Sequence, residues 1–143
     1  FFFGLSVMPP AQRRADEADR LRTLLKAHIL DTPPEKEYDD IVKMLSHLSG
    51  FPIALVSLVD EHRQWFKAKA CTFSDETART VSFCDHVVAS REMLVVHDAA
   101  THPAFSDNAL VLGEPGIRCY IGYPIIPSSA EHCLGALCCI DTV

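Results

Sequence analysis

The grouping with the clearest chemical potential in this chain is Cys84-Asp85-His86. A cysteine at the start of a helix has a lowered thiol pKa, so Cys84 is a candidate reactive thiolate. Side chains on one face of a helix are three or four residues apart, so Cys84 and His86 are expected on different sides. The alternative interpretation is a small buried cysteine, with His86 hydrogen-bonded in or beside a pocket.

The chain contains further cysteines at positions 71, 119, 133, 138 and 139. Their spacing is not that of a small disulfide-bonded scaffold, which predicts reduced thiols and a cytoplasmic protein. Cys138 and Cys139 are neighbours on a predicted strand and are expected to point to opposite faces.

A metal site would have to draw on Cys84, His86, His97, Asp98 and His102. No pair among them has a zinc-binding spacing such as Cys-x-x-Cys. Asp98 has an alternative role as the cap of the turn that follows it. The sequence also has no Ser-His-Asp arrangement, glycine-rich phosphate loop or paired carboxylates, and we therefore predict no metal site, no catalytic residues and no cofactor.

These residues must be positioned by a sheet, and its predicted centre is the run 51–68. Ile53 to Val59 is apolar and rich in β-branched residues, which indicates a strand covered on both faces. A polar turn at 60–63 follows. Residues 64–69 alternate polar with apolar side chains, which predicts a second strand with one wetter face.

Two helices are expected before this hairpin. Residues 12–28 form an amphipathic pattern, with acidic residues early and Lys26 late. Thr32 and Glu35 are spaced as a capping box, with Pro33 at the first helical position, and Gly50 ends the second helix. The predicted apolar face of that helix carries Tyr38, Ile41, Val42, Leu45 and Leu48.

After the hairpin, residues 71–80 are polar and predict a loop or ragged edge. Ser82 with Asp85 opens a short helix over 83–89. A short buried strand is expected at 93–96, a loop with a helical turn at 101–112, and strands at 117–126 and 133–140. Gly122, inside a strand, predicts a group close to its backbone. Short connections between paired strands favour an antiparallel sheet in an α+β domain.

The composition fits one domain. The chain has 143 residues, 48% of them hydrophobic and 22% charged, with a net charge of −6. This acidity excludes an electrostatic footprint for nucleic acid or anionic lipid, and no apolar run reaches the roughly 20 residues that cross a bilayer. We expect residues 1–11 to be a linker remnant and 12–143 to be one domain excised from a larger protein.

Six blocks of the sequence closely resemble a GAF domain of the type found in bacterial sensor kinases, diguanylate cyclases and some eukaryotic multidomain signalling proteins. The blocks are ILDTPPEKEYDDI, PIALVSLVDEHRQWFKA, ETARTVSFCDH, VVHDAATHPAFSDNALV, GIRCYIGYPI and LGALCCID. They follow the family's order over roughly 16–141. One departure is Asp85, which stands where the family often has Ala.

The resemblance implies a central antiparallel sheet of five or six strands, with the N-terminal helices on one face. Short helices and loops between 71 and 116 would enclose a pocket on the other face. From the resemblance we expect the family's C-terminal helix to be missing from this chain. Bilin-binding relatives attach their chromophore through an adjacent Cys-His pair, which Asp85 interrupts here, and the signature of the cyclic-nucleotide-binding members is not found.

The implied function is a sensory or regulatory module that binds a small molecule or forms a homodimer and biases a fused effector domain. Arg118 and Tyr120 share one strand face, and Arg118 pairs either with an anionic ligand or with an acidic residue of the loop at Asp75 and Glu76. Trp65 and Phe105 fit a plain apolar core equally well. The resemblance also implies an alternative function, a thiol-dependent reductase of free methionine-(R)-sulfoxide, an enzyme with the same fold. Sulfoxide reduction needs a thiolate and a second thiol that closes a disulfide, and Cys71, Cys84 and Cys119 would be the candidates for these roles. The predicted ligand-binding residues are Trp65, Phe83, Cys84, His86, Phe105, Asn108, Arg118 and Tyr120.

Overall fold

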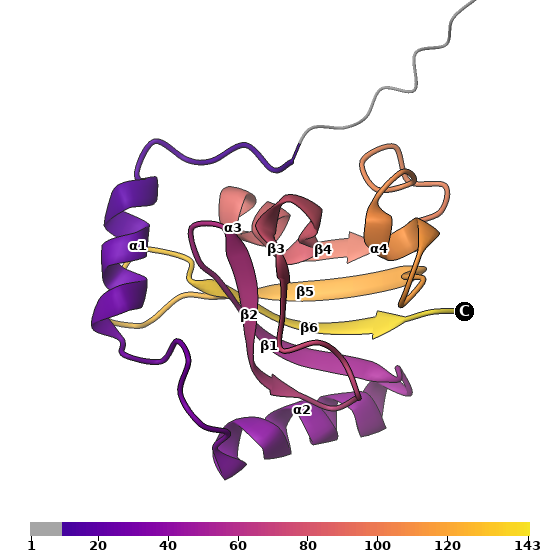
Figure 1. The fold of residues 1–143 in the computed structure, drawn as a ribbon, viewed down its shortest axis with the longest axis horizontal. Coiled ribbons are helices and arrows are strands. Elements are labelled where there is room, and N and C mark those ends of the chain that lie inside the picture. The colour runs from indigo at the N-terminus through magenta and orange to yellow at the C-terminus, as the bar shows by residue number, and fades with distance from the viewer. Residues whose placement is uncertain (1–9) are drawn as a thin grey trace, which may run out of the picture.

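The computed structural model describes residues 10–143, in which six strands form one antiparallel sheet with the order β3-β2-β1-β6-β5-β4 (Figure 1). Residues 1–9, most of the predicted linker, lie outside the described residues. The strands are β1 (Ile53–Val59), β2 (Arg63–Lys69), β3 (Glu76–Ala78), β4 (Leu94–Val96), β5 (Cys119–Ile125) and β6 (Gly135–Asp141). The helices are α1 (Glu17–Lys26), α2 (Lys36–Ser49), α3 (Phe83–Ser90) and α4 (Ala109–Leu112), with a 3-10 turn, η1, at Arg79–Val81. The α+β class and the antiparallel sheet are as predicted.

β1 lies between β2 and β6, and each of its residues is buried. Ile53, Leu55 and Val59 join one layer of the core, while Ala54 and Val56 join the other. Strict alternation of side chains along a strand produces these two faces. The predicted strand with two covered faces is therefore confirmed.

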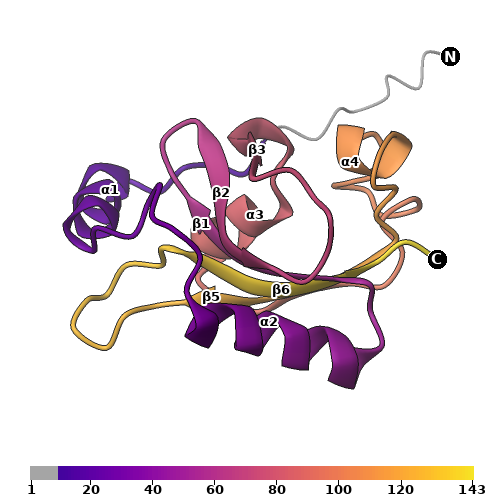
Figure 2. The same cartoon turned by 60° about the horizontal axis from the view of Figure 1, so that its bottom comes forward.

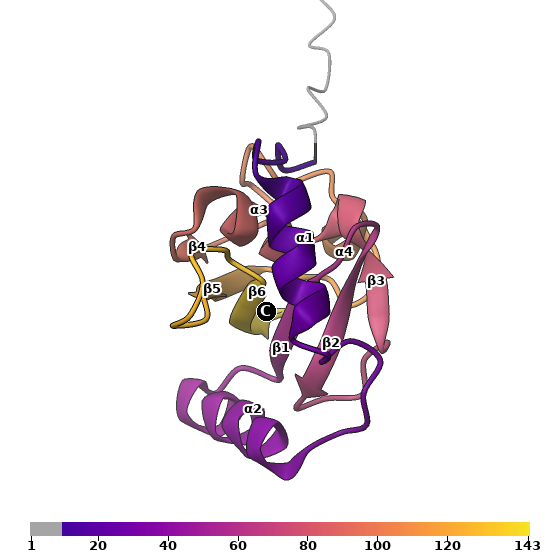
Figure 3. The ribbon, with the colours of Figure 1, turned by 90° about the vertical axis from the view of Figure 1, so that its left-hand side faces the viewer.

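α2 covers one face of the sheet, as predicted, whereas α1 lies beside the sheet at the strand ends (Figures 2 and 3). α2 packs its buried Val42 against Ala54, Val56 and Cys139. α1 packs its buried Leu24 against Leu58, Trp65 and Leu134 at the end of that face. Gly50 follows α2 with φ of 73°, a left-handed conformation that favours glycine.

The opposite face is covered by α3, α4 and the loops around them. Ser82 caps α3, because its Oγ accepts a hydrogen bond of 3.1 Å from the Asp85 N–H. Asn108 caps α4 in the same way, with its Oδ1 accepting from the Leu110 N–H at 2.8 Å. The Ser82 cap was predicted from the sequence.

The predicted capping box at Thr32 is wrong. α2 begins at Lys36, and the Thr32 hydroxyl donates instead to the Ile29 carbonyl at 2.5 Å. The reason lies in β2, where the buried Lys67 ammonium donates to Thr32 Oγ1 and to the Pro33 carbonyl, both at 2.7 Å. The segment thus satisfies a buried charge and cannot open a helix. The first helix is likewise shorter than predicted, running from Glu17 to Lys26.

Two strand predictions also need correction. β2 has no wetter face, since residues 64–68 are all buried and both faces are covered. β4 is not a buried strand but an edge strand, in which Val96 alone is buried and Val95 is exposed. β3, inside the predicted ragged segment, forms the other edge.

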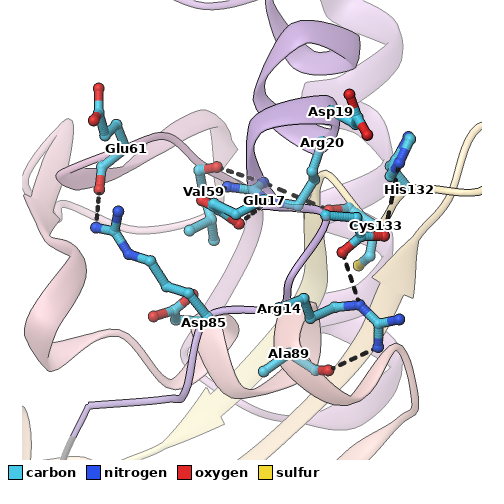
Figure 4. A network of polar contacts seen from close by, with 12 residues as sticks. Arg14, Glu17, Asp19, Arg20, Val59, Glu61, Asp85, Ala89, His132 and Cys133 are labelled. Carbon is cyan, nitrogen blue, oxygen red and sulfur yellow. Dashed lines mark hydrogen bonds and ion pairs between the residues drawn. The ribbon is translucent and has the colours of Figure 1, made fainter.

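A network of charges ties α1 to the rest of the domain (Figure 4). Arg20, with 2% of its side chain exposed, holds both carboxylate oxygens of Glu17 at 2.9 Å and donates to the Val59 carbonyl at 2.8 Å. Arg79 bridges Glu17 at 2.5 Å and Asp85 of α3 at 2.9 Å. Glu17 therefore links α1 to α3 through a buried arginine.

The ionised state of Glu17 is strongly favoured. Burial opposes ionisation, but the hydrogen bonds from Arg20 and Arg79 outweigh it and lower the pKa of Glu17 from 4.5 to about 2. A pKa lowered in the folded state contributes stability that is complete above the unfolded pKa and is lost as the pH falls toward the folded value.

We expect Glu17→Gln to lower the free energy of unfolding by about 2–4 kcal/mol at neutral pH, because two buried arginines lose a shared counter-charge. The difference in the free energy of unfolding between wild type and variant should shrink as the pH falls from about 4.5 toward 2. Only the wild type has a carboxyl group at position 17 that becomes protonated in this range. Urea denaturation across this pH range measures both effects. Glu92→Gln is the control, since Glu92 is exposed and forms no ion pair with any residue in 10–143. An equal loss in both variants, or a constant difference at all pH values, would contradict the assignment.

Candidate functional site

A small cavity lies between the sheet and α3, where the resemblance places a ligand pocket. Its volume is about 10 Å³, room for about one water molecule. The lining is mainly apolar and comes from β1, β2, β5, β6, α3, α4 and the loop after β2. It consists of Leu55, Gln64, Phe66, Phe73, Phe83, Cys84, Leu110, Ile117, Tyr120, Cys138 and Ile140.

The domain's own aromatic side chains fill this space. The rings of Phe83 and Phe105 stack with their centroids 4.0 Å apart, and the Tyr120 ring lies 5.2 Å from that of Phe83. All three are almost fully buried. An apolar ligand of ordinary size would have to displace at least one of these rings.

A set of buried, hydrogen-bonded side chains lies beside the cavity, centred on Gln64. Gln64 Oε1 accepts hydrogen bonds from Ser57 Oγ at 3.1 Å and from Ser82 Oγ at 2.8 Å, and Gln64 Nε2 donates to Thr77 Oγ1 at 2.6 Å. Because Ser82 also caps α3, the amide of Gln64 fixes the start of that helix relative to β1 and β2.

Two thiols meet at the cavity. The sulfur atoms of Cys84 and Cys138 are 3.8 Å apart, and the Tyr120 hydroxyl donates to Cys84 Sγ at 3.1 Å. The contact between the sulfurs, together with burial, raises the pKa of Cys138 well above its usual value. The same contact lowers the pKa of Cys84 against the effect of burial.

The structure brings some of the predicted ligand-binding residues together. Phe83, Cys84 and Tyr120 line the cavity, and Phe105 packs behind Phe83. His86 does not line it. Its ring contacts the edge of Phe105 and borders a shallow surface groove beside Arg14, so Cys84 and His86 do lie on different sides of α3.

The other predicted residues lie elsewhere. Trp65 is on the opposite face of β2, against Leu24 and Leu58. Asn108 caps α4 and donates to the Val81 carbonyl at 3.1 Å. Arg118 donates to the carbonyls of Val111 and Ile117, and the acidic loop residues Asp75 and Glu76 pair with Lys69 and Arg63 instead. Each of these side chains has a structural role.

Sequence reasoning missed Gln64, Ser57 and Cys138 at the cavity. A signal for Ser57 existed, since it is the one polar residue in an apolar run and a buried hydroxyl needs a partner. Cys138 was predicted to lie opposite Cys139, and it does, but no local pattern places it beside Cys84. Such a pairing depends on which strand lies under α3.

The side chains considered for a metal do not meet. Within residues 10–143 no three His, Cys, Asp or Glu side chains are arranged to hold a metal ion. Asp98 Oδ1 accepts from the Ala100 N–H at 3.0 Å, which is the turn cap proposed as its alternative role. None of the helices in the described part of the chain has the length and apolarity needed to span a bilayer.

A side chain does lie close to the backbone of Gly122, as predicted, and it is that of Tyr120. A Cβ at this position would lie 2.7 Å from Tyr120 Cζ, closer than side chains pack. Gly122 therefore makes room for the Tyr120 ring that contacts Cys84.

We expect Gly122→Ala to lower the free energy of unfolding by about 1–3 kcal/mol, because the buried Tyr120 ring must move. The same substitution in a Tyr120→Leu background should cost less, since the obstructing ring is gone. Urea denaturation of the four proteins in this double-mutant cycle measures the coupling. Additive effects would show that Tyr120 does not confine the residue at 122.

Comparison with solved structures places this architecture among known folds. A free methionine-R-sulfoxide reductase from Neisseria meningitidis superposes with a TM-score of 0.60 at 16% identity, covering 91% of this chain and 78% of that one. The GAF domain of an Acinetobacter phosphoenolpyruvate-protein phosphotransferase gives 0.59 at 14% identity, covering 91% and 79%. At these identities the likeness concerns the fold alone.

Comparison of sequences is more specific. A cyclic di-GMP phosphodiesterase from Pseudomonas aeruginosa is 34% identical over 126 residues, which are 88% of this chain and 21% of that protein. The chain thus spans about a fifth of the relative's length. The sequence profile of the GAF domain matches residues 33–143. Most of the chain is included in that match, and this protein therefore belongs to the GAF domain family.

Proposed function

We propose that this domain is a regulatory module of a larger signalling protein, without catalysis of its own, that acts by biasing the conformation of an attached effector. The observation that carries the proposal is the filled cavity. Its thiols are closed off by aromatic rings, and a space for about one water has no room for an amino-acid substrate.

The relation to the phosphodiesterase supports an effector of that class. The matched stretch makes up 21% of the relative, so most of that protein lies outside it. We infer that the present domain is likewise joined to a part that performs the reaction, with hydrolysis of a cyclic dinucleotide as the leading candidate.

The charge network supplies a physical connection for such control. Asp85 lies next to Cys84 in α3, and Arg79 connects Asp85 to Glu17 in α1. A change in the position of α3 would therefore alter the contacts of α1, through which the chain enters the domain. Regulation requires two conformations of the domain, one of which a ligand or partner binds more tightly than the other.

A small-molecule ligand would act by selecting an opened form. Phe73 and Leu110 are the partly exposed members of the cavity lining, so they are the side chains that would move first.

A second copy of the domain, in a homodimer, is the other expected partner. Ile41, Met44 and Leu48 form an apolar stripe along α2 with exposures of 43%, 59% and 75%, which supports a helix-to-helix contact with a second copy.

The reductase alternative keeps one supporting observation, the pair of thiols at 3.8 Å within the fold of known sulfoxide reductases. The other predicted thiols do not join that pair. Cys71 and Cys119 are partly exposed, and burial raises the pKa of each. We therefore rank the regulatory role first.

We expect the domain to reduce free methionine sulfoxide no faster than dithiothreitol does alone, because the substrate cannot reach Cys84. The assay compares wild type with Cys84→Ser and uses the Neisseria meningitidis enzyme as the positive control. Turnover in the wild type that disappears in Cys84→Ser would make the domain an enzyme and refute the regulatory proposal.

Regulation can be tested in a chimera in which this domain replaces the matched stretch of the Pseudomonas aeruginosa phosphodiesterase. We expect Glu17→Gln to change the rate of cyclic di-GMP hydrolysis by at least about fivefold, since it breaks the link between α3 and α1. Glu92→Gln is the matched control and should leave the rate unchanged. Equal rates for all chimeras and for the enzyme lacking the stretch would contradict control by this domain.

A further inference from the structure

The paired thiols at the cavity have the geometry of a site that can be oxidised. Cys84 lies in the first turn of α3 and Cys138 lies on β6, so the two are far apart in sequence but 3.8 Å apart at their sulfur atoms. They are the buried pair of thiols in direct contact among the described residues. A bond between them would join a helix to the central sheet.

The surroundings of Cys84 favour reaction at its sulfur. The Tyr120 hydroxyl donates to Cys84 Sγ at 3.1 Å, and the place of Cys84 in the first turn of α3 favours negative charge there, although the neighbouring Asp85 carboxylate opposes it. Cys138 lies on β6, away from any helix start, and stands as the second thiol. The two sulfurs therefore have different roles, one as the attacking group and one as the resolving group.

Access to the pair is restricted but available to a small molecule. Both thiols line the cavity, which has room for about one water, and the cavity is covered by the partly exposed Phe73 and Leu110. A molecule little larger than water can enter with small movements of these two side chains. Larger oxidants are excluded by the same packing.

We propose that Cys84 and Cys138 form a modification site that hydrogen peroxide converts to a disulfide. The Cys84 thiolate attacks one peroxide oxygen, the O–O bond breaks, and the products are a sulfenic acid at Cys84 and one water. The Cys138 thiol then displaces the hydroxyl from that sulfenic acid, forming the S–S bond and releasing a second water. Two thiols lose two protons and two electrons in total, and one peroxide is reduced to two waters.

The bond would change the packing on which the fold depends. A disulfide of about 2 Å requires the two sulfurs to approach from 3.8 Å, which draws the first turn of α3 toward β6. Tyr120 then loses the thiol to which it donates. The inference does not depend on whether the domain controls an effector, since it concerns the chemistry of the pair itself.

The test treats the reduced, folded domain with hydrogen peroxide, blocks the remaining thiols with iodoacetamide, and maps the products by tandem mass spectrometry without reduction. We expect wild type to lose two hydrogen atoms and to give a cross-link between Cys84 and Cys138, which dithiothreitol reverses. Cys139→Ala is the matched control, because Cys139 is the next residue on β6 and is also buried but faces the opposite side. It should cross-link like wild type.

Cys138→Ala should give no cross-link and should accumulate a sulfenic acid at Cys84, which dimedone traps. The partly exposed Cys71 and Cys119 report that peroxide has acted. Oxidation of these two while Cys84 and Cys138 remain free to react with iodoacetamide in the unfolded protein would overturn the proposal. A cross-link between any other pair would overturn it too, and both results are read from wild type without any variant.

Discussion

The complete burial of β1 is the constraint on which the rest of the structure depends. A strand with apolar side chains on both faces cannot lie at a surface, so each face needs its own cover. α2 supplies one cover, extended by α1 at the strand ends, and α3 with α4 and the long loops supplies the other. Gly135 belongs to the same constraint, because a Cβ there would lie 2.8 Å from Leu58 Cα and push β6 away from β1.

Because both faces are buried, the polar side chains of these strands must find hydrogen-bond partners inside the protein. Gln64 solves it on the cavity side by joining Ser57, Ser82 and Thr77. Lys67 solves it on the opposite face, where its ammonium reaches Thr32, Pro33 and Glu35. Both residues fix a connecting segment against the sheet, so the buried polar groups determine where the covering elements begin.

This explains which parts of the fold could be predicted from the sequence. The β1 strand, the Ser82 cap and the opposite faces of Cys138 and Cys139 follow from local rules of period and capping, and all are confirmed. The capping box at Thr32 obeyed the same local rules and was wrong, because a residue 35 positions away recruits that hydroxyl. Local patterns cannot show such a contact.

The candidate site shows the same division. Phe83, Cys84 and Tyr120 were predicted at the cavity because the resemblance fixed the segments that enclose it. Trp65 and Arg118 lie away from the cavity. The face of β2 that carries the indole and the carbonyls that bind the guanidinium both depend on long-range packing. The pairing of Cys84 with Cys138 is of this kind as well, and no spacing along the chain encodes it.

The filled cavity also bears on how such a domain can signal. An open pocket responds to a ligand by being occupied, whereas a cavity with room for about one water can respond only by repacking. Repacking involves few candidates here, because Phe83, Cys84 and Tyr120 contact one another and α3 carries two of them. The next residue of α3, Asp85, is already bound to Arg79 and through it to α1. Any event that moves the first turn of α3, whether ligand entry or a bond between two thiols, must therefore also strain the buried ion pairs of Arg79.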